Sequence, residues 1–194
     1  MEPTKLANLA PTPARWVSTV LEDFPTFLQD HASCEKKASG MALNIASHYP
    51  DRPALVNAMA ELAVEELSHY REVVRLLTDR GLPPGSDSKD PYVGALNALI
   101  RRGSDVYLLD RLLLAAVIER RGHERFAMLA AALPTGADKR FYEAIANSEA
   151  RHWQLFYSLA ERECEQFDVA RRLSELVEAE AEIMRQQPLR PALH

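Results

Sequence analysis

The sequence predicts an all-α protein built around a four-helix bundle. Ala, Leu, Glu and Arg abound, whereas the 194 residues include only seven glycines, a composition that favours helix. Along four long segments, apolar residues recur at alternating steps of three and four, the spacing that keeps one helix face toward a bundle core. Short, long and short connections join the segments, as in a bundle with one long crossover.

The predicted elements follow one another in a simple order. They are an N-terminal arm (1–16), a hairpin of helices A and B (24–80), a crossover (81–103), a hairpin of helices C and D (104–164) and a C-terminal helix E (167–187). Asp51 and Pro53 predict the cap and the first turn of helix B. Gly81, followed by Pro83 and Pro84, predicts its end. We expect these elements to form a single domain over residues 1–194.

Composition and charge narrow the class of protein. No run of about 18 apolar residues predicts a spanning helix, and the N-terminal stretch lacks the apolar core of a secretion signal. Two cysteines, Cys34 and Cys164, do not make a disulfide framework, which favours the cytoplasm. Residues 161–182 hold eight acidic and three basic side chains, so they account for the net charge of −5 and the remainder is balanced. This balance argues against indiscriminate nucleic-acid binding.

Polar residues interrupt the apolar stripe of each long helix near its middle. On helix B the interruption is Glu66 with His69, one turn apart on the same face. Helix D carries the same Glu-x-x-His spacing at Glu149 and His152. A single Glu-x-x-His motif is weak support for a site because a glutamate-rich chain contains one by chance. Two such motifs, each at the centre of an apolar stripe, predict a functional site.

The two hairpins repeat this pattern, as copies related by a pseudo-two-fold axis would. Glu35 on helix A precedes Glu66 by 31 residues, and Glu119 on helix C precedes Glu149 by 30. Each hairpin therefore offers a lone Glu on its first helix and Glu-x-x-His on its second. The candidate metal ligands are Glu35, Glu66, His69, Glu119, Glu149 and His152.

Four carboxylates buried together need a counter-charge, because desolvation and mutual repulsion both oppose their ionisation. Two divalent cations balance them, and neutral imidazoles complete the coordination. An oxygen-rich donor set suits iron or manganese better than zinc, which prefers tetrahedral sites with nitrogen and sulfur. Ferritin-like di-iron proteins have this arrangement. The predicted fold is therefore a ferritin-like four-helix bundle with one long crossover between helices B and C, a C-terminal helix and short extra helices.

The ligands alone leave the chemistry open. One reading is an O₂-dependent monooxygenase, a second is a manganese catalase or peroxidase, and a third is iron oxidation and storage. No Cys-x-x-Cys pair is present, which disfavours a rubrerythrin-like peroxidase. Storage requires a shell of many subunits, so a monomer or dimer would exclude it.

Three segments carry a resemblance to a specific family. They are "DHASCEKKASGMALNIASHYPDRPALVNAMAELAVEELSHYREVVRLL", "AAVIERRGHERFAMLA" and "YEAIANSEARHWQLFYSLA". With the intervening chain from about residue 20 to 185, they resemble the MiaE family of tRNA hydroxylases. The resemblance implies that Glu35, Glu66 and His69 hold one side of a di-iron pair. Glu119, Glu149 and His152 would hold the other, with at least one bridging carboxylate.

The same resemblance implies the reaction. Enzymes of this family hydroxylate the isopentenyl group of 2-methylthio-N6-isopentenyladenosine in tRNA, with two non-haem iron ions and O₂. The side chains need only bind metal, exclude water and position the prenyl group. The chain lacks flavin, haem and cysteine-cluster motifs, so we expect an external electron donor, such as a reductase. We expect no membrane partner, and a monomer or a dimer.

Basic pairs follow equivalent ligands in both hairpins. Lys36 and Lys37 follow Glu35, and Arg120 and Arg121 follow Glu119. These four side chains are candidate contacts to tRNA phosphates, although a solvated helix face with i,i+4 acid pairing gives the same pattern. The contact hypothesis predicts that tRNA binding weakens steeply with salt.

One further polar residue lies on the core stripe of helix A. His31 precedes Glu35 by one turn, so it is either a hydrogen-bonded core histidine or a partner that orients the ligand. Small residues near the ligands, among them Ala115 and Gly122, leave room for a prenyl chain or allow close helix packing.

Overall fold

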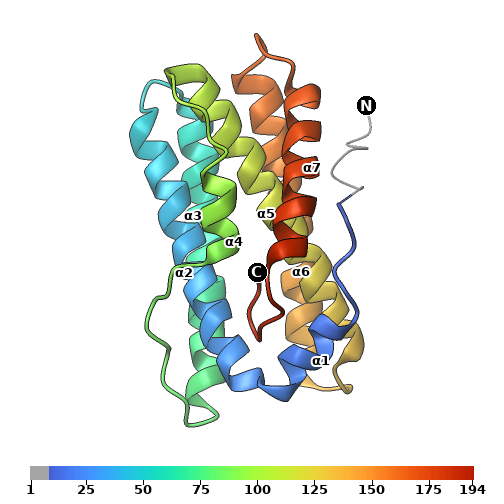
Figure 1. Ribbon diagram of the computed structural model, residues 1–194. Coiled ribbons are helices and arrows are strands. Elements are labelled where there is room, and N and C mark those ends of the chain that lie inside the picture. Colours follow the sequence, from blue (N-terminus) through green and yellow to red (C-terminus); the bar gives the residue numbers. More distant parts are fainter. Residues whose placement is uncertain (1–8) are drawn as a thin grey trace. The chain divides into compact units, whose positions relative to one another are not determined.

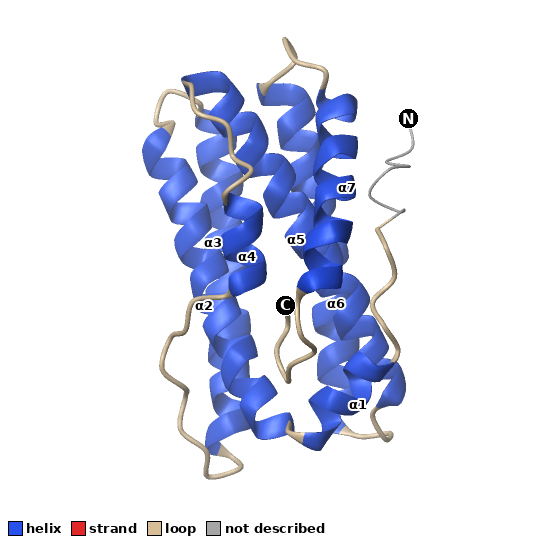
Figure 2. Ribbon diagram, viewed as in Figure 1, coloured by secondary structure: helices blue, strands red, loops and turns tan. Residues whose placement is uncertain are grey.

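The computed structural model describes residues 9–194, apart from the side chains of residues 104 and 105, and shows helices and loops only within this range (Figures 1 and 2). The helices are α1 (Arg15–Glu22), α2 (Phe24–His48), α3 (Pro53–Thr78), α4 (Pro91–Asn97), α5 (Ser104–Ala132), α6 (Ala137–Glu163) and α7 (Val169–Gln186). The all-α prediction is confirmed. No helix in the described part of the chain is long and apolar enough to span a membrane.

The chain divides into two compact units. One comprises the described residues up to 17, together with 89–188 and His194, and the other comprises 18–88 and 189–193. Each unit contains one long helical hairpin, which is α5–α6 in the first and α2–α3 in the second. The single domain expected over 1–194 stays a prediction.

The α2–α3 hairpin begins with a side-chain cap. The Asp23 carboxylate accepts a hydrogen bond from the Thr26 amide at 3.2 Å, which satisfies one of the free donors of the first turn. The helices lie side by side (Figure 1), and the Ser39 hydroxyl donates to the Ala63 carbonyl at 2.8 Å. The predicted cap of helix B is wrong in one detail, because the N-cap is Arg52, without a side-chain hydrogen bond, rather than Asp51. Pro53 does occupy the first turn.

The α5–α6 hairpin forms the centre of the other unit, and α7 packs against α5. The Lys139 ammonium donates to the Ala130 carbonyl at 2.6 Å across the hairpin turn. Four glutamates lie on α7, and one of them, Glu180, is fully buried. This buried acid shows that α7 is not simply a solvated helix.

The crossover has two parts that lie in different units. Its first part runs beside α2, where the Ser33 hydroxyl donates to Asp87 at 2.9 Å and the Gln29 amide donates to the Pro83 carbonyl at 2.8 Å. Its second part contains α4, whose N-terminus is capped by Asp90 through hydrogen bonds from the Tyr92 and Val93 amides. The crossover therefore contributes to both units.

The N-terminal arm predicted over 1–16 is only partly described, since residues 1–8 lie outside the described range. The sequence reading missed α1, which begins at Arg15. Trp16 is buried, and the Arg125 guanidinium lies 5.3 Å from the centre of its ring. This stacking and burial hold the start of α1 against α5.

Candidate metal centre

The α2–α3 hairpin brings its three predicted ligands together. Glu35 projects from α2, and Glu66 and His69 project from α3; all three are buried. His69 Nδ1 lies 3.4 Å from Glu66 Oε2 and 3.6 Å from Glu35 Oε2. One donor atom from each of the three residues lies within 4.8 Å of the others, which is close enough for a single ion to bind all three.

His31 completes a hydrogen-bonded chain in this hairpin. Its Nε2 lies 2.6 Å from Glu35 Oε1, and the ring is fully buried. Of the two readings of His31, the structure supports the partner that orients the ligand, because the imidazole fixes one carboxylate oxygen of Glu35 while the other faces His69.

The electrostatics of this cluster favour ionised carboxylates. Burial alone would raise the pKa of Glu35, but hydrogen bonds to His31 and His69 outweigh it and hold that pKa below its ordinary value. Burial opposes a charged His69, yet Glu35 and Glu66 raise the pKa of this imidazole to about 10. Without a metal, a proton on His69 therefore compensates part of the charge of the two carboxylates. A cation would displace such a proton and take its place.

The α5–α6 hairpin brings the other three predicted ligands together. Glu119 lies on α5, Glu149 and His152 lie on α6, and all three are buried. One donor atom from each lies within 4.8 Å of the others. The distance from His152 Nδ1 to Glu149 Oε1 is 3.8 Å, and the Ser148 hydroxyl lies 3.4 Å from His152 Nε2. The imidazole is therefore held at one nitrogen by a neighbour while the other faces a carboxylate.

Gly122 lies beside Glu149 in the same hairpin. A Cβ atom at this position would lie 3.5 Å from Glu149 Oε2, which is ordinary van der Waals contact. A side chain as small as that of alanine would therefore fit here without displacing Glu149.

Each cluster fits a metal ion. Two buried carboxylates and one imidazole form an oxygen-rich donor set of the kind that binds iron or manganese. Glu66 is only 1% exposed, and a carboxylate so deeply buried is retained only where a cation or hydrogen-bond donors compensate it. In each hairpin, the predicted ligands therefore form a buried carboxylate–imidazole cluster of a kind that binds metal, and their role as ligands stays a prediction.

The four residues predicted to contact tRNA phosphates differ in their exposure to solvent. Arg121 does not fit that role because it is fully buried, and its guanidinium donates to both carboxylate oxygens of Glu180, at 2.9 and 3.0 Å. Arg120 is half-buried. Lys36 and Lys37 are exposed, with Lys36 2.9 Å from Asp87 and Lys37 donating to the Ser88 carbonyl at 2.7 Å. These three remain candidates for phosphate contact.

The sequence reading missed the network around Arg121. Tyr92 donates to Glu180 Oε1 at 2.8 Å, and Arg121 also donates to Glu124 and to the Ala10 carbonyl. No local motif marks the pairing of Arg121 with Glu180 or with Ala10, because these partners lie far from it in the sequence. Their burial, with guanidinium facing carboxylate, indicates a structural rather than a metal-binding role.

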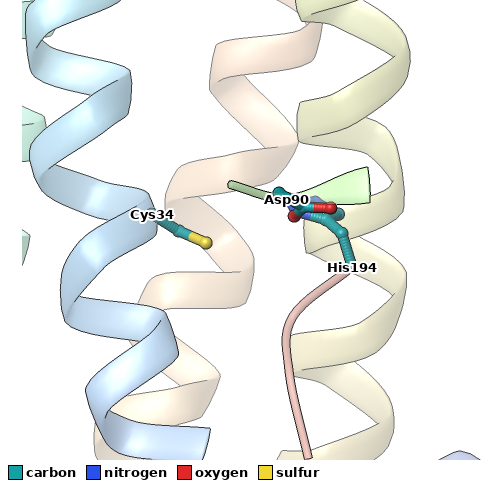
Figure 3. A group of neighbouring side chains, drawn as sticks. All are labelled: Cys34, Asp90 and His194. Carbon is teal, nitrogen blue, oxygen red and sulfur yellow. The ribbon is translucent and has the colours of Figure 1, made fainter. Parts of the chain in front are cut away.

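A further imidazole–carboxylate pair lies beside α4. His194 Nδ1 is 3.5 Å from Asp90 Oδ2, and the imidazole stacks on Tyr92 with the ring centres 5.1 Å apart. Figure 3 draws the side chains of Asp90 and His194. Figure 3 also draws Cys34, whose Sγ lies 3.8 Å from Asp30 Oδ2 within α2. Asp90 already serves as the cap of α4, so we assign this pair a structural role.

Comparisons with known proteins identify the family of this chain. The family model described as tRNA-(MS[2]IO[6]A)-hydroxylase (MiaE) matches residues 2–194. Two curated relatives are both described as tRNA 2-(methylsulfanyl)-N(6)-isopentenyladenosine(37) hydroxylase. The one from Pseudomonas putida is 39% identical over 174 residues, covering 90% of this chain and 84% of the relative. The one from Salmonella typhimurium is 26% identical over 223 residues, covering 90% and 82%.

A solved structure supports the fold. It is a protein from Synechococcus described as having aldehyde deformylating oxygenase activity; its TM-score is 0.88 and its identity 35%, over 94% of this chain and 90% of that chain. With the all-helical structure, this similarity confirms the predicted ferritin-like fold class. The family model spans nearly the whole chain, and the motif segments that first suggested the family carry the two buried clusters. The chain therefore belongs to the MiaE family of tRNA hydroxylases.

Proposed function

We propose that this protein hydroxylates the isopentenyl group of 2-methylthio-N6-isopentenyladenosine in tRNA, with O₂ as co-substrate. The observation that carries the proposal is the family match over residues 2–194 in a chain that also buries two Glu, Glu, His clusters. A tRNA substrate would place the enzyme in the cytoplasm.

We propose that the two clusters together bind two iron ions. Four carboxylates carry a charge of −4, which two Fe²⁺ ions balance while the imidazoles of His69 and His152 bind as neutral ligands. When bound, the iron pair would supply the activation of O₂ that the insertion of oxygen into an allylic C–H bond requires.

The protein's own residues then have three tasks. His31 holds one oxygen of Glu35 at 2.6 Å, and Ser148 lies at hydrogen-bond distance from His152, so both orient ligands. The buried leucines and phenylalanines of the same stripes exclude water. Ala115 precedes Glu119 by one turn and Gly122 lies beside Glu149, and we propose that these small residues help to accommodate a prenyl group.

Electrons must come from outside the chain. With only two cysteines and no flavin or haem motif, the sequence offers no redox group besides the proposed iron ions. We propose an electron-transfer protein or reductase as donor, and a monomer or dimer as the working form. Lys36, Lys37 and Arg120 remain the proposed phosphate contacts, for which we expect a steep decrease of tRNA affinity between low and high salt.

The decisive experiment is nucleoside analysis of tRNA that contains the isopentenyl precursor. The tRNA is incubated with iron-loaded protein, O₂ and a chemical reductant, and the nucleosides are separated and identified by mass. We expect a product heavier than the precursor by one oxygen atom, formed only when O₂ is present. Unchanged precursor after incubation with protein of verified iron content would reject the function while leaving the metal site intact.

A second candidate function follows from the solved structure from Synechococcus, whose description includes aldehyde deformylating oxygenase activity. Its 35% identity over 94% of this chain justifies a parallel assay with a medium-chain aldehyde. Loss of the aldehyde with release of formate, and no change in the tRNA nucleosides, would favour this alternative.

A further inference from the structure

One interhelical hydrogen bond recurs at the same place in both long hairpins. In the α2–α3 hairpin, the Ser39 hydroxyl donates to the Ala63 carbonyl at 2.8 Å. In the α5–α6 hairpin, Nδ1 of His123 lies 2.7 Å from the Ala146 carbonyl oxygen. A carbonyl oxygen only accepts, so this imidazole nitrogen carries a proton and donates. In each hairpin, a side chain of the first helix therefore binds a backbone carbonyl of the second.

In the α2–α3 hairpin this bond lies about one helical turn from the predicted metal ligands. Ser39 follows Glu35 by four residues on α2, and Ala63 precedes Glu66 by three on α3. Residues three or four apart share one face of a helix, so the bond and the ligands lie on the same side. Because the two helices are antiparallel (Figure 1), the step forward along α2 and the step back along α3 lead in the same direction. With a rise of 1.5 Å per residue, each step covers roughly 4.5–6 Å.

The α5–α6 hairpin repeats these offsets with a different donor. His123 follows Glu119 by four residues, and Ala146 precedes Glu149 by three. The donor is an imidazole here and a hydroxyl in the other hairpin, whereas the acceptor is an alanine carbonyl in both. The feature that recurs is therefore the bond and its place relative to the predicted ligands.

Other polar side chains of the long helices bind their own helix. The Ser47 hydroxyl and the His48 imidazole each donate to the carbonyl four residues earlier on α2. Such a bond within one helix is a common arrangement for serine. Ser39 and His123 instead donate to the neighbouring helix, where both acceptor alanines are buried. Their position next to the partner helix is thus specific to these two places.

A bond at this place fixes how the two helices of a hairpin are aligned. The acceptor carbonyl has two lone pairs, so it keeps its bond within the helix while it accepts a second one. Because a hydrogen bond has a preferred length and angle, it opposes sliding or rotation of one helix against the other. Either movement would change the distance between the lone Glu and the Glu-x-x-His pair. A metal site tolerates changes of only about 0.2 Å in its ligand distances.

We propose that Ser39 and His123 are positioning residues, which hold the lone Glu of each hairpin in register with its Glu-x-x-His pair for iron binding. This inference rests on the proposed function, because it assigns the two residues a role at the proposed iron ligands. Neither residue touches the ion or the substrate in this role. Each acts through the alignment of the backbones that carry the ligands.

The Fe²⁺ affinity of the full chain tests the proposal without turnover. Anaerobic competition with a chromogenic chelator measures it. Ser39→Ala and His123→Leu remove the donors, and we expect each to weaken Fe²⁺ binding by about tenfold, as residues outside the coordination shell do. Ser39→Thr keeps a hydroxyl and His123→Asn keeps an N–H donor, so both should restore most of the affinity.

Three control variants separate this role from a general effect on the helices. Ser47→Ala and His48→Leu remove the same kinds of donor from bonds within α2, and they should leave Fe²⁺ affinity unchanged. Lys139→Met removes an interhelical bond of the α5–α6 hairpin that lies ten residues before Glu149. It should lower the Tm without changing Fe²⁺ affinity.

Circular dichroism verifies that each variant is folded. If Ser39→Ala does not fold, Ser39→Cys, whose thiol is a weaker donor, takes its place. With saturating iron, both donor-removing variants should show a lower kcat for tRNA hydroxylation and an unchanged KM for tRNA. Weakened and restored Fe²⁺ binding, without any hydroxylated nucleoside from the unsubstituted protein, would support the positioning role and reject the proposed function.

Three results would overturn the positioning role. The first is unchanged Fe²⁺ affinity in either donor-removing variant, and product formation by the unsubstituted protein would then leave the proposed function standing. The second is a loss of affinity that the variants with a retained donor do not restore. The third is an equal loss in Lys139→Met, which would assign the two bonds to the general stability of the hairpins.

Discussion

Two buried clusters of this protein contain glutamates that face different kinds of basic side chain. In the α2–α3 hairpin, Glu35 and Glu66 face the imidazoles of His31 and His69. In the other unit, Glu180 faces the guanidinium of Arg121 through two hydrogen bonds and also accepts one from Tyr92. All of these glutamates are buried, so burial alone does not separate a metal ligand from a structural acid.

The difference between the clusters lies in their counter-charge. A guanidinium keeps its proton at any pH relevant to a protein, so its charge is a permanent part of the fold. An imidazole can release its proton and then coordinate a cation through the same nitrogen. The first cluster is therefore suited to exchange protons for metal, whereas the second is suited to hold α5 and α7 together.

The largest expected effect is the loss of a ligand. Glu66→Gln keeps the size of the side chain but removes its charge, and we expect iron content to fall below half and hydroxylation to fall by more than about 100-fold, since outer residues of metal sites already cost 10–100-fold. Iron analysis and the nucleoside assay measure both. Glu65→Gln, one residue earlier, is the matched control and should keep both values. Full iron content in Glu66→Gln would remove this residue from the site.

Substitution in the cluster of Arg121 and Glu180 should instead lower the stability of the fold. Arg121→Met leaves Glu180 buried opposite an apolar side chain, and we expect the free energy of unfolding to fall by about 3–5 kcal/mol. This corresponds to a decrease in Tm of roughly 10 °C for a chain of this size. The double variant Arg121→Met with Glu180→Leu should recover part of the loss. Unchanged thermal unfolding of the single variant would contradict a structural role for the pair.

A smaller effect is expected from the residue that distinguishes the two hairpins. His31 orients Glu35, whereas the equivalent position four residues before Glu119 is Ala115. His31→Ala should weaken iron binding by about 10–100-fold, and His31→Gln, which keeps a donor, should recover part of it. Competition with a chelator measures the affinity. Equal iron affinities in all three proteins would show that this hydrogen bond does not support the ligand.

The smallest effect concerns a carboxylate–imidazole pair outside both clusters. Burial would raise the pKa of Asp90, but His194 and the Val93 and Tyr92 amides lower it from 3.8 to about 2. Because the folded pKa is the lower one, this group stabilises the protein above pH 3.8 and loses its contribution as the pH falls toward 2.

Asp90→Asn should therefore destabilise the protein by about 1 kcal/mol near neutral pH and by less in acid. Chemical denaturation of both proteins at several pH values measures the difference. A difference that stays constant from pH 6 to pH 2.5 would mean that the ionisation of Asp90 contributes nothing.

Much of the candidate site could be predicted from the sequence, because the spacing of residues along a helix decides which side chains share a face of that helix. The steps of three and four placed Glu66 and His69 on one face, and the apolar residues around them indicated that this face is buried. The second hairpin repeats the same Glu-x-x-His motif with a Glu about 30 residues before it, so the pattern is difficult to attribute to chance. The helix α1 was not predicted although Trp16, Val17, Val20 and Leu21 have helical spacing, because this spacing extends over only eight residues. No local pattern marks the burial of Arg121.

Spacing along single chain segments is enough to predict the long helices, the crossover and the register of the predicted ligands on each hairpin. The environment of Arg121 depends instead on how distant segments pack in the folded chain. Two residues beyond Glu119, it turns to the opposite side of α5, the side that a bare four-helix bundle exposes. Here α7 supplies Glu180, 59 residues later, and residues 10–12 complete the cover. Helix periodicity predicts the direction of a side chain, whereas the packing of distant segments determines which residues that side chain contacts.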